Sequence, residues 1–261
     1  MTTALIGTPL TRATDSLIPV ALTELNQAQL HDRVESKVIL AEVDLPEAIE
    51  RLAGEYRVME HEDSRVQRYR NDYFDTSDLR NYHEHHNQNG RRVKARYRTY
   101  VNSDLTFFEV KRSIHGRTVK ERRASCPSQQ GLAPADATFF FRTTGLRPSL
   151  LQPSVSISYD RILLVKRDLS ERVTIDINLE FAHGGNVATV PGLAICEFKQ
   201  PRLDLRSPAI EALDRRPQMF SKYCIGLASC DSSLRRNRFK KVFRNLEAIG
   251  ATPISREQIT R

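Results

Sequence analysis

Residues 91–98 read Arg-Arg-Val-Lys-Ala-Arg-Tyr-Arg and place cations at alternate positions. Successive side chains of a β-strand point to opposite faces, so four cations would share one face, namely Arg92, Lys94, Arg96 and Arg98. Cations at this spacing repel each other unless solvent, acidic side chains or a polyanion compensates them. The octet therefore predicts either a solvated strand or one wall of an anion-binding site.

The same division into a charged and an apolar face recurs in other segments that are expected to be strands. The charged faces carry Glu35, Lys37, Glu109, Lys111, Lys120, Arg122, Arg161, Asp176, Glu197 and Lys199. One interpretation is an antiparallel sheet with an ordinary solvated face. The alternative is a closed barrel with these faces inward and with helices over its apolar exterior. Because buried unpaired charge is costly, such an interior would need a bound anion to be stable.

A polyphosphate chain with a divalent metal would suit such an interior. Arginine offers a fork of donors to phosphate, and lysine offers a point charge. Carboxylates are ligands that Mg²⁺ and Mn²⁺ favour. The residue types therefore predict phosphate chemistry if the charged faces are enclosed.

Composition narrows the class of protein. The chain has 261 residues, of which 39% are hydrophobic, and its 40 Lys and Arg against 32 Asp and Glu give a formal charge of +8. A basic balance favours anionic partners, whereas the many acidic residues argue against a simple nucleic-acid binder. No apolar run approaches the ~20 residues of a membrane span, and the N-terminus does not resemble a signal peptide. We expect a cytoplasmic protein with reduced cysteines.

The strand and helix patterns predict one antiparallel-rich α+β domain with about eight strands. We expect a flexible N-terminal arm over residues 1–30, the domain over residues 31–250 and a tail over residues 251–261.

Short motifs in a defined order carry a family resemblance. They are Glu35-Ser-Lys37, Tyr73-Phe-Asp-Thr76, Lys94-Ala-Arg-Tyr-Arg98, Phe108-Glu-Val-Lys111, Lys120-Glu-Arg122, Tyr159-Asp-Arg161, Thr174-Ile-Asp176, Glu197-Phe-Lys199 and Ser221-Lys-Tyr223. With them the chain resembles the VTC domain, a branch of the triphosphate tunnel metalloenzyme or CYTH-like superfamily. The resemblance implies an eight-stranded antiparallel β-barrel tunnel with a charged interior, flanked and capped by helices.

The resemblance also implies an activity and its residues. The implied reaction transfers the γ-phosphoryl group of ATP to a growing inorganic polyphosphate chain, releases ADP and depends on Mn²⁺ or Mg²⁺. The implied catalytic residues are Arg96, Arg98, Lys111, Arg161 and Lys222. The implied phosphate-binding residues are these five with Lys37, Lys94, Lys120, Arg122 and Lys199. Glu197 is the implied principal metal ligand, with Glu35, Glu109 and Asp176 as further candidates.

Alternatives within this resemblance stay open. Arg33 occupies the place where many hydrolases of the superfamily have a first glutamate, which favours the polymerase branch. The alternatives are a triphosphate or polyphosphate hydrolase and a non-catalytic polyphosphate- or nucleotide-binding module. A membrane protein partner at the inner face of a membrane is compatible with the family, and the sequence does not indicate an oligomeric state.

Two further segments have competing interpretations. His83, His85 and His86 could indicate a transition-metal site, but their spacing is more typical of a solvated loop. Residues 235–244 (RRNRFKKVFR) could form a nucleic-acid or anionic-lipid patch. We favour a solvated helix for this segment, with Phe239, Val242 and Phe243 packed on the domain.

Overall fold

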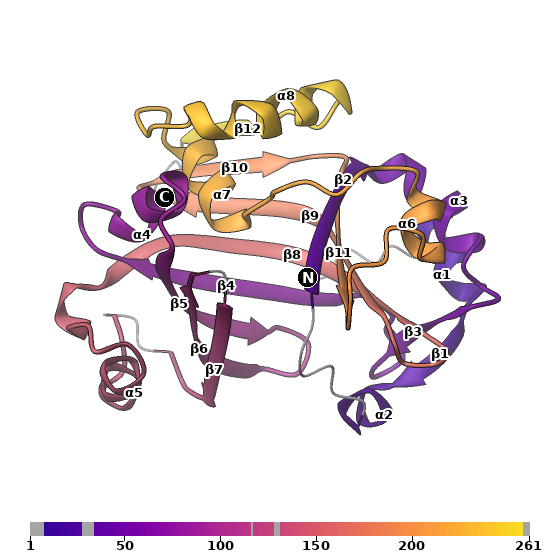
Figure 1. Cartoon of the computed structure of the whole chain (residues 1–261), viewed down its shortest axis with the longest axis horizontal. Coiled ribbons are helices and arrows are strands. Elements are labelled where there is room, and N and C mark those ends of the chain that lie inside the picture. The colour runs from indigo at the N-terminus through magenta and orange to yellow at the C-terminus, as the bar shows by residue number, and fades with distance from the viewer. Residues whose placement is uncertain (1–7, 28–33, 116, 128–130, 258–261) are drawn as a thin grey trace.

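Strands with one charged and one apolar face form a large curled sheet in this protein (Figure 1). The computed structural model describes residues 8–27, 34–115, 117–127 and 131–257. The strands are β1 (Ile18–Ala21), β2 (Val34–Ala41), β3 (Tyr56–Glu60), β4 (Gln67–Asp75), β5 (Arg91–Tyr100), β6 (Leu105–Ile114), β7 (Arg117–Ala124), β8 (Gln152–Lys166), β9 (Arg172–His183), β10 (Asn186–Val190), β11 (Leu193–Gln200) and β12 (Ile254–Glu257).

The helices lie between and around these strands. They are α1 (Pro9–Asp15), α2 (Leu22–Gln27), α3 (Leu45–Glu50), α4 (Arg80–His86), α5 (Pro134–Thr144), α6 (Pro208–Leu213), α7 (Lys222–Cys230) and α8 (Lys240–Ala248), with 3₁₀ turns at η1 (Glu42–Asp44), η2 (Pro148–Leu150) and η3 (Asn237–Phe239).

Eight strands form the curled part of the sheet, in the order β7-β6-β5-β4-β8-β9-β11-β2. The sheet divides at β9, whose first half pairs with β11 and whose second half pairs with β10, the partner of β12. All of these pairs are antiparallel, and only the peripheral pair of β1 with β3 is parallel among the described strands. The predicted fold class, an antiparallel α+β tunnel, is confirmed.

The closure of the tunnel differs from the closed barrel expected from the sequence. Within the described residues no ladder joins the edge strands β2 and β7. β7 exposes charged side chains along most of its length, and charge on an edge strand disfavours further pairing. A side-chain contact reaches across this opening instead, since Lys111 Nζ of β6 lies 3.5 Å from Glu35 Oε2 of β2.

Helices cover the apolar outer face of the sheet, as expected. α5 packs on one part, where Phe140 joins Ala95, Tyr97, Phe108 and Val110 in a buried cluster. α1, α3 and α6 cover a second cluster, which includes the outward residues of β2, β9 and β11. Burial of these apolar faces is what turns the charged faces inward.

Helix α7 packs on the inner side of the sheet. Its residues share a core cluster with Ile157 and Phe181 of β8 and β9 and with α8. Gly226 makes the close approach possible, because a Cβ atom at this position would lie 2.4 Å from Phe181 Cδ1. The helix therefore seats tightly enough to bring its first turn into the hollow of the sheet.

A β-bulge changes the predicted alternation in β9. The sequence suggests that Asp176, Asn178 and Glu180 share a face, but Asn178 has a φ of 53° and the register with β8 shifts beside it. An extra residue reverses the side-chain alternation beyond it. Leu179 and Phe181 consequently join the inner core, while Asn178 and Glu180 are exposed.

Described parts of the segments expected to be an arm and a tail form regular secondary structure. Residues assigned to a flexible arm form α1, β1 and α2, because Leu10, Ala13 and Leu17 bury in the outer core and β1 pairs with β3. In the segment assigned to a tail, β12 adds to the edge of β10. Among the described residues, no helix has both the length and the apolar character needed to cross a bilayer.

Candidate functional site

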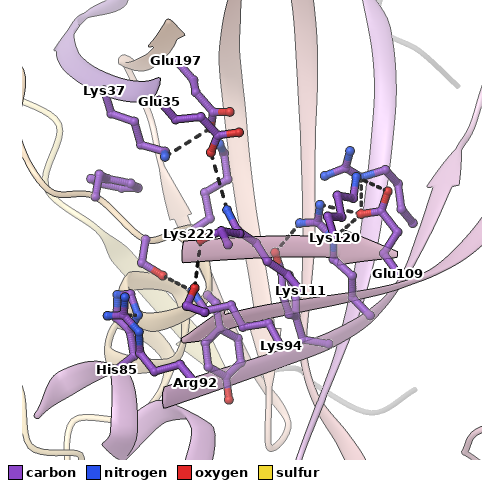
Figure 2. Close-up of a pocket in the computed structure, with 18 of the residues that line it drawn as sticks. Glu35, Lys37, His85, Arg92, Lys94, Glu109, Lys111, Lys120, Glu197 and Lys222 are labelled. Atoms are coloured by element: carbon purple, nitrogen blue, oxygen red, sulfur yellow. Dashed lines mark hydrogen bonds and ion pairs between the residues drawn. The ribbon is translucent and has the colours of Figure 1, made fainter. Parts of the chain in front are cut away.

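The concave face of the sheet and the first turn of α7 enclose a cavity of about 330 Å³ (Figure 2). Ten of its lining residues are lysine or arginine and three are glutamate. The cations are Lys37, Arg92, Lys94, Arg96, Arg98, Lys111, Lys120, Arg161, Lys199 and Lys222, and the glutamates are Glu35, Glu109 and Glu197. The four alternating cations of residues 91–98 therefore face the inside of the curled sheet and not its outer surface.

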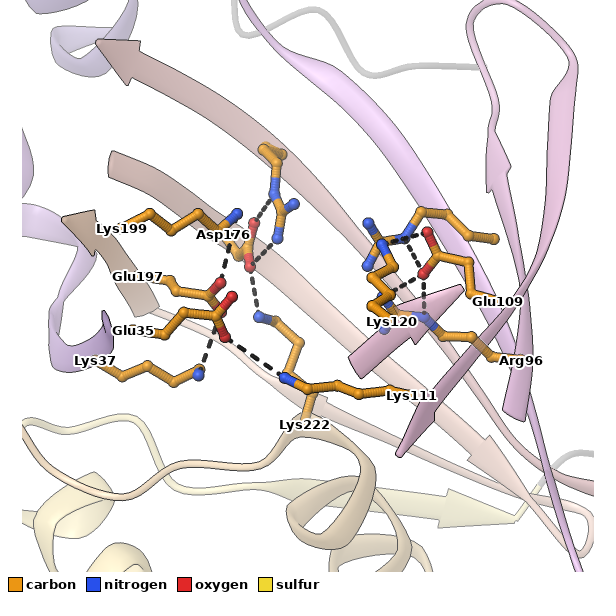
Figure 3. Close-up of polar contacts among 12 residues, drawn as sticks. Glu35, Lys37, Arg96, Glu109, Lys111, Lys120, Asp176, Glu197, Lys199 and Lys222 are labelled. Carbon is orange, nitrogen blue, oxygen red and sulfur yellow. Dashed lines mark hydrogen bonds and ion pairs between the residues drawn. The ribbon is translucent and has the colours of Figure 1, made fainter. Parts of the chain in front are cut away.

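Glu109 organises the wall formed by β5, β6 and β7. Arg96 Nε and Nη2 lie 2.9 and 2.8 Å from Glu109 Oε2, and Lys120 Nζ lies 2.6 Å from Oε1. Arg98 Nε is 3.6 Å from the same carboxylate and donates to Asn71 Oδ1 at 3.1 Å. One buried carboxylate therefore holds three cations in fixed positions at the cavity (Figure 3).

Asp176 of β9 likewise positions cations, on the side of the cavity formed by β8, β9 and α7. Arg161 Nε and Nη2 donate to its two carboxylate oxygens at 2.5 and 2.8 Å, which is a bidentate pair. Lys222 of α7 also donates to Asp176. Asp176 is fully buried and does not line the cavity, whereas both of its cationic partners do.

Glu197 and Glu35 lie together on β11 and β2 (Figure 3). Lys37 Nζ and Lys199 Nζ lie 3.3 and 3.5 Å from the Glu197 carboxylate. The Glu197 side chain is 17% exposed, whereas those of Asp176 and Glu109 are buried. This is the part of the cavity where two carboxylates stand close enough to influence each other's ionisation.

A row of three lysines crosses the wall without an acidic residue between them. Lys94 and Lys111 are ladder partners on β5 and β6, and Lys111 and Lys120 are ladder partners on β6 and β7. Like charges directly opposite each other are destabilising. Lys94 makes no ion pair with a carboxylate within the described part of the chain, and its Nζ donates to Ser221 Oγ at 3.1 Å.

The carboxylates are ionised despite their burial. Burial opposes the ionisation of Glu197, but Lys199 and Lys37 outweigh it and hold the Glu197 pKa well below its usual range. Burial likewise opposes ionisation of Glu109 and Asp176, and their cationic partners lower both pKa values. For Glu35, burial and Glu197 raise the pKa, while the lysines around it produce a net lowering.

The same burial disfavours the charged forms of some basic side chains. Burial lowers the pKa of Lys94 to about 8, and neighbouring lysines and Arg92 add to the lowering. Burial also lowers the pKa of Lys120 to about 8. Burial, Lys94 and Arg92 together lower the pKa of His85 to about 3, so this imidazole is neutral near pH 7.

Most of the residues implied by the family resemblance come together here. All of the predicted phosphate-binding residues line the cavity except Arg122, which packs over the Phe107 ring at 4.7 Å. Arg122 still faces inward, because it is the ladder partner of Glu109. Arg33, which occupies the place of the first glutamate of many hydrolases, lies outside the described residues.

The histidines do not occupy the solvated loop expected from their spacing. They belong to helix α4, where Tyr82 and His86 are buried. His85 lines the cavity beside Arg92, whose Nη1 lies 3.5 Å from His85 Nδ1. Sequence reasoning missed His85 and underrated Arg92, although the alternation of the octet already placed Arg92 on the cationic face.

Tyrosines complete the lining, and reasoning from charge alone did not select them. Arg96 donates to the Tyr73 hydroxyl and lies 5.3 Å from the centre of that ring. Lys222 lies 5.0 Å from the centre of the Tyr159 ring. The charged ends of Arg96 and Lys222 make cation–π contacts with these rings, which help to position them.

No group of three or more His, Cys, Asp or Glu side chains with metal-binding spacing occurs among the described residues. Glu109 and Asp176 each stand singly among cations, whereas Glu197 and Glu35 stand together, with Lys37, Lys111 and Lys199 beside them. A Mg²⁺-type ion is often held by one or two carboxylates and by the phosphates of its substrate. The donor set therefore fits a metal that arrives with a phosphate ligand and not an all-protein metal site.

Comparison with known proteins identifies a family and several structural relatives. The family model "VTC domain" matches residues 32–135 and 145–231. No curated protein matches the chain. A candidate adenylate cyclase from Bacillus halodurans is 13% identical, with 85% of this chain and 92% of that chain covered and a TM-score of 0.43.

Two further solved structures show similar values. A Pyrococcus horikoshii protein is 10% identical, with 75% of this chain and 99% of that chain covered and a TM-score of 0.43. A candidate adenylyl cyclase from Hippeastrum, described as having a dominant triphosphatase activity, is 12% identical, with 65% and 80% covered and a TM-score of 0.40.

Proposed function

The chain belongs to the VTC domain family, and from this membership and the cavity we propose that the protein is a polyphosphate polymerase. In the proposed reaction, the γ-phosphoryl group of ATP is transferred to a growing inorganic polyphosphate chain and ADP is released. Family membership supports a function on polyphosphate or triphosphate, and the choice of transfer to a chain is our proposal.

The observation that carries the proposal is the excess of cations in an enclosed space. Ten lysines and arginines line the cavity with three glutamates, and the row of Lys94, Lys111 and Lys120 has no acid between its members. Glu109 and Glu35 offset part of the charge of Lys120 and Lys111, but ten cations still exceed three carboxylates, so this arrangement favours a multiply charged anion. A linear chain of phosphates supplies charge along the length of such a cavity, which a single carboxylate ligand would not.

The reaction requires positioning and charge neutralisation more than covalent chemistry. In phosphoryl transfer the attacking and leaving oxygens lie roughly in line, and negative charge is spread over the transferred group. We assign Arg96 and Arg98 to one wall, and Arg161 and Lys222 to the other, as the donors that hold the reacting phosphates. Glu109 and Asp176 fix these donors before the substrate arrives, so little reorganisation is needed in the transition state.

The terminal oxygen of the polyphosphate acceptor would be the nucleophile. No protein nucleophile is needed, and the neutral His85 imidazole at one end of the cavity adds no charge to the repulsion among Arg92 and Lys94. Lys37, Lys111 and Lys199 would neutralise the phosphates near Glu197.

A divalent cation fits the pair Glu197 and Glu35. Bound there, Mg²⁺ or Mn²⁺ would supply Lewis-acid stabilisation of phosphate charge. Glu197 is the better placed ligand, because its carboxylate is only partly buried and its neighbours are point-charge lysines that a metal–phosphate complex can displace. Glu109 and Asp176 have the positioning role described above.

The test is to incubate the purified protein with ATP and Mn²⁺ or Mg²⁺ and to resolve the products on a gel stained for polyphosphate. Long chains together with ADP are expected. Free phosphate without chains would show a hydrolase, and tight triphosphate binding without turnover would show a binding module. A variant with Arg161→Gln and Lys222→Gln provides the control for contaminating activity and should form no product.

A further inference from the structure

The basic segment, residues 234–244, lies outside the match to the family and carries a dense group of cations. It includes η3 and the start of α8 and contains six exposed cations: Arg235, Arg236, Arg238, Lys240, Lys241 and Arg244. None of the six forms an ion pair with a described residue, and no acidic residue interrupts the segment. This concentration of unpaired charge is the feature that the catalytic cavity does not explain.

The segment is held firmly on the domain and is not a loose tail. Val242 and Leu246 are buried in the inner core, and Phe239 and Phe243 pack against it. Figure 1 shows α8 on the side of the sheet that also carries α7. The apolar side of the segment thus packs on the domain as predicted, while its six cations are exposed to solvent.

Helix α4 connects this surface to the cavity. The Tyr82 hydroxyl donates to the Arg235 carbonyl at 2.7 Å, and His86 Nε2 lies 2.8 Å from Asn237 Oδ1. His85, which lines the cavity, stacks on Phe239 with ring centres 6.5 Å apart. One ring contact therefore separates the His85 and Arg92 end of the cavity (Figure 2) from the basic segment.

The dimensions of the cavity show why a surface beyond it is useful. A space of about 330 Å³ accommodates a small-molecule ligand but not a long polymer. A long polyphosphate chain with one end in this cavity must continue along the protein surface. At the His85 end, the basic segment adjoins the cavity through the His85–Phe239 contact and offers exposed cations of opposite charge to such a chain.

We propose that the basic segment is a second polyanion-binding surface, which holds the part of a polyphosphate chain that extends out of the cavity past His85. This inference rests on the proposed function, because it takes polyphosphate as the ligand. Phosphate oxygens would contact several lysines and arginines, and binding would be sensitive to salt.

The test compares a short and a long phosphate chain on charge variants. The basic-segment variant is Lys240→Gln, Lys241→Gln and Arg244→Gln. A matched control, Arg142→Gln, Arg147→Gln and Arg202→Gln, removes the same charge from exposed sites that do not line the cavity. The probes are tripolyphosphate, which fits the cavity, and long-chain polyphosphate, with affinity measured over a series of salt concentrations.

We expect the basic-segment variant to bind long-chain polyphosphate about tenfold more weakly at low salt, with a smaller salt dependence. Its affinity for tripolyphosphate, and both affinities of the control, should match those of the wild type. Equal losses in the two variants, or no loss in either, would overturn the proposal. Thermal unfolding establishes that both variants fold.

Anionic vesicles containing phosphatidylserine test the competing occupant. If the basic-segment variant loses vesicle binding and keeps its long-chain affinity, the surface is a lipid site and the proposal is wrong. Failure of the proposed function would show itself separately, as a wild-type protein that makes no polyphosphate from ATP. The charge variants compare affinities and need no turnover, so the two results are independent.

Discussion

Two buried carboxylates, Glu109 in the cavity wall and Asp176 behind it, each contact more than one cation. Glu109 contacts Arg96 and Lys120, and Asp176 contacts Arg161 and Lys222. Removal of one such carboxylate would leave several cations mutually repelling, whereas removal of one cation would leave the carboxylate still paired. The carboxylates are therefore expected to be the residues most sensitive to substitution, for reasons of position as well as charge.

Glu197→Gln tests the metal assignment at the scale of one residue. The amide removes the charge that would hold a divalent cation, so we expect turnover to fall by at least about 100-fold while tripolyphosphate binding is retained. Product formation and isothermal titration measure the two effects. Glu47→Gln, at an exposed position on α3, is the control. An active Glu197→Gln enzyme would show that this glutamate holds no essential metal.

Lys94 predicts a dependence of binding on pH. Its pKa is lowered to about 8 by burial, so its charge is lost as the pH rises from 7 to 9. A bound phosphate favours the charged form of Lys94. Because binding and protonation are linked, phosphate affinity falls as the charged form disappears. The wild type should therefore lose about three- to tenfold more tripolyphosphate affinity over this range than Lys94→Gln does.

The comparison of the two proteins removes the titration of the ligand itself, which is common to both. Lys94→Arg keeps its charge across the range and should lose less affinity than the wild type. The His85 pKa of about 3 leaves that residue neutral throughout. Parallel pH profiles for the wild type and Lys94→Gln would contradict the assignment of Lys94 to the phosphate site.

At the scale of elements, α7 connects the core to the cavity. Ser221 accepts a hydrogen bond from Cys224 N at the start of this helix and another from Lys94 Nζ. The next residue, Lys222, contacts Asp176 on β9. The position of the first turn thus depends on how closely the rest of the helix packs against β9.

Gly226→Ala tests this packing. The added methyl group would lie 2.4 Å from Phe181 Cδ1, so helix or ring must shift at a cost of about 1–3 kcal/mol, which exceeds the gain in helix propensity. We expect a lower urea midpoint and weaker tripolyphosphate binding through displacement of Lys222. Gly54→Ala, which meets no atom within 4 Å, is the matched control. A stabilised Gly226→Ala protein would disprove the close seating of α7.

On the scale of the whole molecule, the curled sheet brings cations from many strands into one space and remains open between β2 and β7. The cations of the walls repel one another, and we expect an anion between the walls to relieve this repulsion. Lys111 and Glu35 contact each other across this opening.

Tripolyphosphate should therefore raise the melting temperature. At a concentration of about 100 times Kd, binding contributes about 2.7 kcal/mol, which corresponds to a shift of about 5–10 °C for a chain of this length. Scanning calorimetry measures the shift, with sodium chloride at matched ionic strength as the control. An equal shift with sodium chloride would indicate general screening and not a bound ligand.

The side-chain alternation of the strands could be read from the sequence alone. Because successive residues of a regular strand face opposite ways, the octet and the Glu-x-Lys pairs already placed their charges on one face. The order of the motifs indicated the family, and the apolar positions indicated which face the helices cover. These are local properties of the chain, independent of which strands become neighbours.

Only the tertiary structure decided which charges meet. The pairing of Arg161 with Asp176 and Lys222, the bulge at Asn178 and the position of His85 depend on contacts between segments far apart in the chain. The opening between β2 and β7 likewise depends on the curvature of the whole sheet. No local pattern encodes these distances, because they result from how helices and strands pack against one another.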